Sequence, residues 1–268
     1  MKRLLIAGCG DLGQRLAAVV AGKGWQVTGL RRRAEVLQAP IRPLSADLSR
    51  PDTLVPVAGH WDAVVYQATP DERSEAGYRR AYRDGLANLL ELISTPRLLF
   101  VSSTAVYGED QGSWVDEDTP PEPQRFNGQI MLEAEDLAGS AGGICVRFSG
   151  IYGPGREYLL RSVRTGKARC RRTPPQWTNR IHVDDCAGVL AHLLDLDRAE
   201  PVYCATDNLP APRCEVLDWL ATRLGVEPPA EDDQAEGCGK RISNRRLTSS
   251  GYRFLYPDFR SGYASLLP

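Results

Sequence analysis

A glycine-rich segment near the N-terminus has the residue types and spacing to bind a pyrophosphate. The segment Gly8-Cys9-Gly10-Asp11-Leu12-Gly13 follows an apolar run and precedes an amphipathic stretch. Gly8 allows a tight turn, Gly10 lets the backbone approach the pyrophosphate, and Gly13 lets the next helix pack closely on the strand. Unpaired N–H groups and the dipole at that helix start favour an anion. The segment predicts a dinucleotide site with Asp11 and Leu12 among its residues; the alternative is a tight turn without a ligand.

Arginines follow the second apolar run, where a site for NAD would carry an acidic residue. Arg31, Arg32 and Arg33 come directly after the strand expected at 26–30. A carboxylate at this point holds the ribose 2′-hydroxyl of NAD, whereas a guanidinium can hold a 2′-phosphate with two parallel hydrogen bonds. Arg31 and Arg32 therefore favour NADP(H) as the cofactor, with NAD(H) possible. A basic surface loop is the alternative.

Asp47 and Leu48 follow a third short strand, where they would meet the adenine edge of the cofactor. Asp47 could equally cap a helix at 51–58, since a carboxylate is a common N-cap. The residues leave both interpretations open.

The elements that must position these residues alternate along the first half of the chain. Apolar runs typical of buried parallel strands lie at 4–8, 26–30, 62–68, 98–103 and 143–148, and helical periodicity lies at 11–23, 72–94 and 127–139. This alternation predicts right-handed βαβ units, with helices on both faces of a parallel sheet. We expect an α/β fold with a Rossmann-type doubly wound sheet over 1–150, and a smaller C-terminal substrate lobe over 151–268 interleaved with it.

Composition and cysteine spacing argue against several classes of binding partner and site. The net charge of −1 gives no global basic field, which argues against nucleic acid or anionic membranes as partners. No stretch approaches the roughly 20 apolar residues that a membrane span requires. The seven cysteines are scattered, form no C-x-x-C pair and have no metal-ligand spacing, so we expect free thiols, no metal site and a cytoplasmic location.

Several motifs together resemble the extended short-chain dehydrogenase/reductase family, the nucleotide-sugar epimerases and dehydratases. They are GCGDLG (8–13), Asp47-Leu48, VVYQAT (64–69), GLANLLE (85–91), FVSSTAVYG (100–108), RFSGIYGPG (147–155) and NRIHVDD (179–185). The resemblance implies a parallel sheet with the dinucleotide across its carboxyl edge, and a small-molecule substrate held by the C-terminal lobe. It further implies that Ala68, Thr69 and Ser102 line the cofactor site, and that Ile151 lies near the nicotinamide.

The chain departs from this family at the residues that transfer the proton. The family carries a tyrosine and, four residues later, a lysine; the matching positions here are Asn127 and Met131. An amide cannot act as a phenolic acid, and a thioether supplies no charge. The acidic pair of the dehydratases is also replaced, by Thr104 and Ala105, so dehydration is not expected. The chain is similar to an atypical branch of the family, and fold alone does not establish its reaction.

Few residues remain as catalytic candidates. The resemblance makes Ser103 the hydroxyl that hydrogen-bonds the reacting oxygen, and Tyr107 a possible proton donor or a structural residue. His182 is mainly structural in the family. Arg180 and Arg156 could hold an anionic group of the substrate, or be solvated or structurally paired.

Two functions follow from these features. The first is an NADP(H)-dependent oxidoreductase or epimerase that acts on a small carbonyl, hydroxyl or sugar-nucleotide compound. The second is a non-catalytic NADP(H)-binding sensor or scaffold, which the loss of the tyrosine and lysine at positions 127 and 131 motivates. The resemblance is compatible with a monomer or with a homodimer formed through 72–94 and 127–139.

Overall fold

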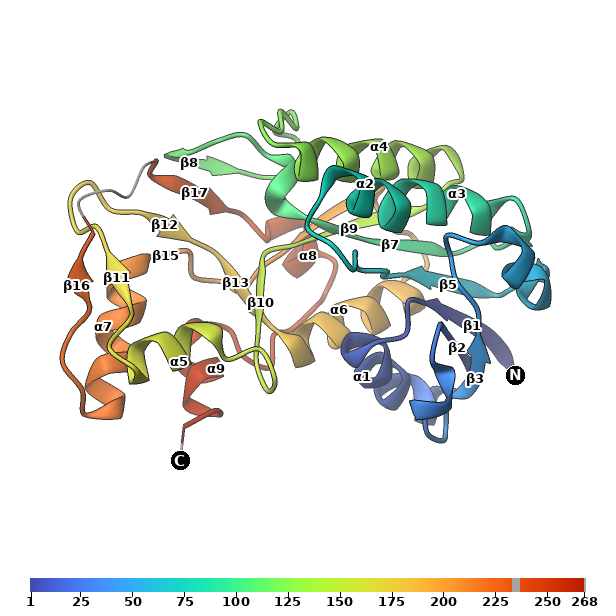
Figure 1. The fold of residues 1–268 in the computed structure, drawn as a ribbon, viewed down its shortest axis with the longest axis horizontal. Helices are drawn as coiled ribbons and strands as arrows, with labels where there is room; N and C mark the ends of the chain where they lie inside the picture. Colours follow the sequence, from blue (N-terminus) through green and yellow to red (C-terminus); the bar gives the residue numbers. More distant parts are fainter. Residues whose placement is uncertain (233–236, 268) are drawn as a thin grey trace. The chain divides into compact units, whose positions relative to one another are not determined.

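Seven strands form the central sheet in the order β14-β9-β7-β5-β1-β2-β3 in the computed structural model, which describes residues 1–232 and 237–267 (Figure 1). The strands are β1 (Lys2–Ala7), β2 (Trp25–Arg31), β3 (Arg42–Ser45), β5 (Ala63–Tyr66), β7 (Leu98–Ser103), β9 (Ile144–Phe148) and β14 (Val202–Ala205). The pairs β1–β2, β1–β5, β2–β3 and β5–β7 are parallel. All five expected apolar runs are strands of this sheet, which confirms the predicted Rossmann-type fold.

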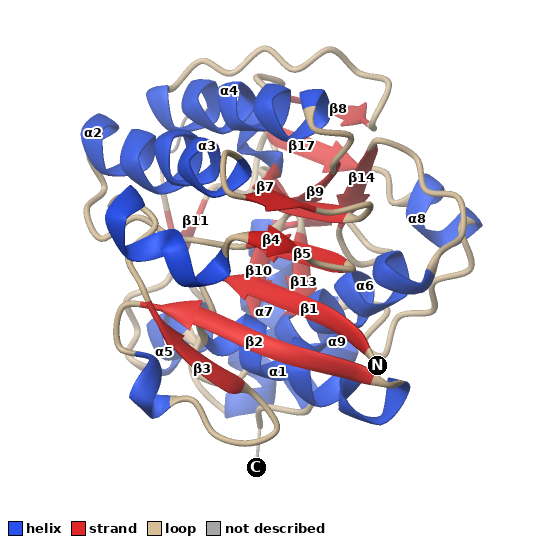
Figure 2. Ribbon diagram, turned by 90° about the vertical axis from the view of Figure 1, so that its right-hand side faces the viewer, coloured by secondary structure: helices blue, strands red, loops and turns tan. Residues whose placement is uncertain are grey.

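Helices cover both faces of the sheet, as apolar strands of this kind require. Figure 2 shows α2 (Glu75–Tyr78), α3 (Gly85–Leu90) and α4 (Phe126–Ser140) over one face, with α1 (Asp11–Val20) and α6 (Val183–Asp195) on the other. The single helix expected over 72–94 is interrupted by a π-helical segment, Arg79–Asp84, between α2 and α3. The Tyr66 hydroxyl donates a hydrogen bond of 2.5 Å to the Ala81 carbonyl within that segment.

The strand order reverses at β1, which creates a crevice at the carboxyl edge of the sheet. From β1 the chain proceeds outward through β2 and β3, and it then returns to the other side of β1 as β5 and β7. Ala7, the last residue of β1, lies opposite Leu30 of β2 and Tyr66 of β5. Residues that follow these three strands therefore meet at one edge, which is where open α/β sheets bind ligands.

The chain divides into two compact units whose segments alternate along the sequence. The N-terminal unit comprises Met1–Val106, Pro123–Arg147 and Ala187–Tyr203, and the C-terminal unit comprises Tyr107–Glu122, Phe148–Cys186 and the chain from Cys204 onward. Among the residues that the structure describes, no helix is both long and apolar enough to cross a membrane.

Small sheets and helices build the C-terminal unit. β15 (Ala211–Pro212), β12 (Trp177–Thr178), β17 (Gly239–Ile242) and β8 (Gln111–Val115) form one sheet in that order, and β10 (Gly150–Tyr152) pairs in parallel with β13 (Arg180–His182). The helices α5 (Tyr158–Arg164), α7 (Arg213–Leu224), α8 (Arg245–Ser249) and α9 (Phe259–Ala264) also belong to this unit. Tyr152, Leu217 and Phe259 are among the buried residues of its apolar core.

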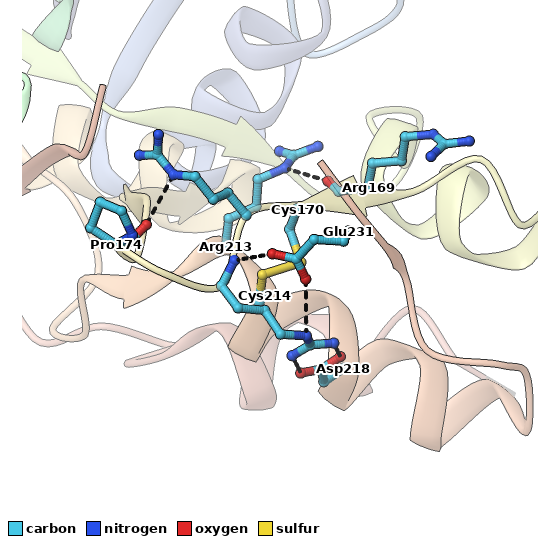
Figure 3. The surroundings of a disulfide bond; sticks show 9 residues. Arg169, Cys170, Pro174, Arg213, Cys214, Asp218 and Glu231 are labelled. Carbon is cyan, nitrogen blue, oxygen red and sulfur yellow. Dashed lines mark hydrogen bonds and ion pairs between the residues drawn. A yellow bond between two sulfur atoms is a disulfide. The ribbon is translucent and has the colours of Figure 1, made fainter. Parts of the chain in front are cut away.

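The expectation that every cysteine is a free thiol is wrong for one pair. Cys170, on β11 (Arg169–Cys170), forms a disulfide with Cys214 in the first turn of α7 (Figure 3). The two positions are 44 residues apart, so no local spacing pattern reveals their pairing. Cys9, Cys145, Cys186, Cys204 and Cys238 are not disulfide-bonded, and the first four are buried. Cys145 and Cys204 are residues of the buried core.

Charged side chains surround the disulfide (Figure 3). Arg172 reaches Asp218 of α7 at 2.8 Å, and its backbone N–H donates to Glu231 at 2.9 Å. Arg213 donates to the Arg169 carbonyl at 3.2 Å. The first half of α7 is therefore fixed to the segment 169–172 by one covalent bond and by polar contacts on each side of it.

Candidate functional site

The turn between β1 and α1 has a shape that only glycine permits at two of its positions. Gly8 has a φ of +83°, and a Cβ there would lie 2.7 Å from the backbone of Ala68. A Cβ on Gly13 would lie 2.9 Å from Ile6, so α1 packs directly against the strand. A Cβ on Gly10, by contrast, would meet only the Gly8 carbonyl, at 3.9 Å. Gly10 therefore leaves open space beside the backbone at the start of α1.

This open space leads into a cavity of about 230 Å³ at the carboxyl edge of the sheet. The cavity is lined by Gly8, Cys9, Gly10, Leu30, Arg31, Arg32, Arg33, Ala46, Asp47, Leu48, Ser49, Ala68, Thr69, Asp71, Gly77, Arg80 and Ala81. The first-turn amides of α1 have no intrahelical acceptor, and Gly10 supplies no side-chain cap. The cavity thus combines backbone donors with cationic side chains, which suits a ligand that carries several phosphates.

Most residues predicted to bind the cofactor line this one cavity. They are Gly8, Gly10, Arg31, Arg32, Asp47, Leu48, Ala68 and Thr69. Asp11, Leu12 and Gly13 belong to the first turn of α1 and are not in its lining; Asp11 pairs with Arg15 at 3.1 Å. Ser102 and Ile151 do not line it either, and Ile151 belongs to the C-terminal unit. The cofactor-binding roles of all thirteen residues stay predictions.

Four arginines and two aspartates set the charge of the cavity. Arg31 donates to the Cys9 carbonyl at 3.4 Å, which directs its guanidinium back over the glycine turn. Arg32 forms two hydrogen bonds with Asp71, of 2.5 and 2.6 Å. Burial raises the pKa of the Cys9 thiol to about 11, so this cysteine is a neutral lining group at pH 7 rather than a nucleophile.

Asp47 does not cap the 3₁₀ helix Pro51–Val57, whose N-cap is Arg50 without a side-chain cap, and its place at the adenine edge stays a prediction. Its carboxylate accepts the backbone N–H and the hydroxyl of Ser49, at 2.9 and 2.8 Å, and its carbonyl accepts the Thr53 hydroxyl at 3.0 Å. These bonds shape the turn that leads into the 3₁₀ helix Pro51–Val57. Asp47 also lines the cavity together with Leu48.

Arg80, Asp71 and Gly77 line the cavity and were not predicted from the sequence. Arg80 lies in the π-helical segment, and Asp71 lies on the loop between β5 and α2. π-Helical turns are frequent at functional sites, because the extra residue displaces side chains from the ordinary helical register. The signal available in the sequence was the arginine-rich run 79–83, which reads as an exposed helix face.

Ser102 is held by a buried ion pair on the same sheet. Its hydroxyl donates to Glu135 of α4 at 2.5 Å, and Glu135 accepts from Arg147 of β9 at 2.6 and 2.9 Å. Both charged side chains are 5% exposed. Removing either partner would leave a buried charge unpaired, so this triad fixes α4 to β7 and β9.

The catalytic candidates occupy contrasting surroundings. The Ser103 hydroxyl accepts the Ala105 N–H at 3.2 Å, and the residue is half-buried. Tyr107 is 3% exposed, and its hydroxyl donates to the Asp116 carbonyl at 2.7 Å. Met131 is buried in α4, where its thioether supplies no charge. Ser103 and Tyr107 stay predicted catalytic residues, and the hydrogen bond of Tyr107 favours its structural alternative.

A second cavity, of about 220 Å³, lies within the C-terminal unit. It is lined by Gly150, Ile151, Tyr152, Arg156, Tyr158, Leu159, Thr178, Asn179, Arg180, Arg213, Val216 and Tyr263. Arg180 is 5% exposed, and among the described residues its Nη1 has no hydrogen-bond partner. The Tyr152 hydroxyl is likewise buried without a partner among them. Burying a donor without a hydrogen-bond partner costs free energy of folding. Such donors are therefore typical of sites that bind a ligand.

His182 packs in an aromatic cluster with Tyr152, one of the residues that line this cavity. Its ring is 4.1 Å from that of Tyr256 and 5.3 Å from that of Tyr152. Its Nδ1 accepts the Asp184 N–H at 3.2 Å, at the start of α6. These contacts agree with the structural role that the family resemblance implies.

Known proteins resemble the chain over nearly its whole length. Protein YeeZ of Escherichia coli K12 is 31% identical over 96% of this chain and 97% of its own. A 3-diazoavenalumate denitrifying reductase of a Streptomyces species is also 31% identical, over 97% and 98%.

Two solved structures share the fold. One, described as an NAD-dependent epimerase/dehydratase from Methylobacillus flagellatus, is 41% identical, with a TM-score of 0.84 over 99% of this chain and 97% of that one. The human epimerase family protein SDR39U1, solved with NADPH, is 20% identical, with a TM-score of 0.78 over 99% and 98%.

The family model of the NAD dependent epimerase/dehydratase family matches residues 4–203. The match includes the glycine turn, the FVSSTAVYG segment and all seven strands of the central sheet, except the first two residues of β1 and the last two of β14. On this match and on the identities of its relatives, the chain belongs to the NAD dependent epimerase/dehydratase family.

Proposed function

We propose that the chain binds NADP(H) in the N-terminal cavity and acts as an oxidoreductase or epimerase on a small carbonyl, hydroxyl or sugar-nucleotide compound. The observation that carries this proposal is that the glycine turn and four arginines line one cavity. Gly8 and Gly10 would present backbone N–H groups to the pyrophosphate, and Arg31 and Arg32 would hold the 2′-phosphate. NAD(H) remains the second choice of cofactor.

Ser103 is the residue that we expect to serve the reacting oxygen of the substrate. Because its hydroxyl already accepts the Ala105 N–H, its hydrogen remains for donation to a carbonyl oxygen. The nicotinamide supplies the hydride, which is chemistry that the cofactor brings to any such site. The relative described as a reductase supports hydride transfer to a substrate as the reaction class.

The C-terminal cavity supports a substrate that carries an anionic group. Arg180 lines it with an unpaired Nη1, and Arg213 supplies a second guanidinium. A carboxylate or phosphate would satisfy both groups, since guanidinium forms its strongest hydrogen bonds to such anions.

Binding of the cofactor can be tested by calorimetry with NADPH and NADH at matched salt. Arg31→Ala should weaken NADPH binding about tenfold and leave NADH within twofold, because a charge-assisted hydrogen bond contributes about 1.5 kcal/mol or more. Arg42→Ala, an exposed arginine outside the cavity lining, is the matched control. Equal affinity of the wild-type protein for both cofactors would contradict the preference for NADP(H).

A non-catalytic NADP(H) sensor or scaffold is the second candidate. It is favoured by the uncharged, buried Met131 and by the Tyr107 hydroxyl, which is engaged with a backbone carbonyl. Screening carbonyl compounds for oxidation of NADPH distinguishes the two. Turnover that Ser103→Ala abolishes supports the enzyme, whereas tight binding without turnover supports the sensor.

A further inference from the structure

Asp71 lies across an arginine that would otherwise be available to a phosphate. Its carboxylate oxygens accept hydrogen bonds from both Nη atoms of Arg32, at 2.6 and 2.5 Å. Both residues line the N-terminal cavity. The planar fork of Arg32 is therefore occupied by an anion that belongs to the chain itself.

A second arginine of the cavity acts on the same carboxylate. The hydrogen bond from Arg32 is the largest influence that holds the pKa of Asp71 below its usual value, and the charges of Arg32 and Arg80 add to it. Arg80 comes from the π-helical segment and lines the cavity as well. The carboxylate of Asp71 thus lies in the positive field of two cavity arginines.

A carboxylate and a phosphate bind a guanidinium with the same geometry. Each presents two oxygens to two parallel N–H groups, so one fork holds one anion at a time. A phosphate that approached Arg32 would also be repelled by the negative charge of Asp71. Since the Arg32 and Asp71 side chains are 59% and 62% exposed, their pair is held weakly enough to open.

We propose that Asp71 sets the preference of this cavity between NADPH and NADH, by competing with the 2′-phosphate for the guanidinium of Arg32. The proposal rests on the proposed function, that is, on NADP(H) binding in this cavity. NADH carries no 2′-phosphate, so it can bind while the Arg32–Asp71 pair stays closed. NADPH gains the contact with Arg32 only after Asp71 has been displaced.

The test is calorimetric titration of the full chain with NADPH, NADH, 2′,5′-ADP and 5′-ADP. The two ADP probes isolate the 2′-phosphate, and their binding does not depend on turnover. For Asp71→Asn we expect NADPH and 2′,5′-ADP to bind about threefold to tenfold more tightly, because an exposed ion pair is worth up to about fivefold and the repulsion adds to it. The affinities for NADH and 5′-ADP should stay within twofold.

Two further variants separate competition from a general charge effect. Asp52→Asn breaks the Arg50–Asp52 pair, whose side chains are similarly exposed at 64% and 67% and lie outside the cavity lining, and it should change none of the affinities. In an Arg32→Ala background, Asp71→Asn should gain at most half of its wild-type effect, since the competed group is gone. An Asp71→Asn protein that binds NADPH no more tightly than wild type, or less tightly, overturns the proposal.

The outcomes also distinguish this inference from the proposed function. A wild-type protein that binds neither NADPH nor 2′,5′-ADP refutes the proposed cofactor and the inference together. A wild-type protein that binds NADPH normally, with an Asp71→Asn variant of unchanged affinity, refutes the role of Asp71 alone.

Discussion

The two cavities both contain arginine, but they keep it in opposite physical settings. In the N-terminal cavity the Arg32 side chain is 59% exposed and is satisfied by Asp71. In the C-terminal cavity Arg180 is 5% exposed, and its Nη1 has no hydrogen-bond partner among the described residues. An exposed charge costs little to retain, whereas a buried unpaired donor costs free energy of folding.

This difference indicates how each cavity would select a ligand. Water and salt screen the exposed arginines, so they can tune affinity by a few fold between similar anions. The buried guanidinium acts in a lower dielectric, where an anion is either bound strongly or excluded. The first cavity is thus suited to choosing between two cofactors, and the second to requiring one charged group on a substrate.

Removal of the disulfide should have the largest effect on stability and should destabilise the C-terminal unit more than the N-terminal unit. Cys170→Ser opens a covalent loop with a separation of 44 residues, and loop entropy predicts a loss of about 4 kcal/mol in the free energy of unfolding. Urea unfolding with and without dithiothreitol measures it, and hydrogen exchange should rise in the C-terminal unit while β1 and β2 stay protected. Cys238→Ser, a free thiol of the same unit, is the control. Equal stability of the oxidised and reduced wild-type protein would contradict this prediction.

Replacement of the buried charged residues Arg180 and Asp207 should have the next largest effect. It should show whether Arg180 serves ligand binding or the stability of the fold. Arg180 and Asp207 are 5% and 1% exposed and interact electrostatically. The double variant Arg180→Met, Asp207→Asn replaces both with neutral side chains, and the free energy of unfolding should stay equal or rise by up to about 4 kcal/mol, because burying charges carries a desolvation cost. Turnover of an anionic substrate should fall by at least about tenfold, the loss of one charge-assisted hydrogen bond. Destabilisation by this pair of substitutions would instead show that Arg180 serves the fold. Arg260→Met is the control, since this arginine is half-buried and its guanidinium pairs with Glu215.

The smallest expected effect is a pH dependence of the stability that arises from Asp207 in the C-terminal unit. Burial raises the pKa of Asp207 to about 7, so the folded chain binds this proton more tightly than the unfolded chain. Stability from this group is therefore lost as the pH rises through about 7, by about 1.4 kcal/mol between pH 6 and pH 8. Asp207→Asn should remove that loss, so its stability relative to wild type should increase over the same interval. Asp52→Asn provides the comparison, and parallel pH profiles for wild type and Asp207→Asn would contradict the assignment.

The sequence revealed those parts of the N-terminal cavity that are determined locally. Gly8 and Gly10 follow a strand directly, Arg31 and Arg32 follow the next one, and parallel strands bring their carboxyl ends to one edge. Backbone geometry alone therefore assembled eight of the predicted residues around the cavity.

Contacts that depend on side chains from distant segments could not be predicted in this way. Asp71 reaches Arg32 across 39 positions, and the hydroxyl of Ser102 finds Glu135 across 33. The pairing of Cys170 with Cys214 depends on how α7 packs against β11, and neither element has a pattern that fixes the contact. Local periodicity carries no information about such long-range contacts, because tertiary packing determines them.

The π-helical segment Arg79–Asp84 has an evolutionary consequence. A π turn corresponds to one residue inserted into an α-helix, so its loss would rotate the preceding helix by about 100° relative to α3. Arg79, which pairs with Glu133 at 2.7 Å, and Arg80, which lines the cavity, would then turn away together. A single deletion would thus remove a packing contact and a cavity-lining side chain at once. A relative with one residue fewer between β5 and β7 should accordingly lack this cavity arginine, even where an arginine is still present in its sequence.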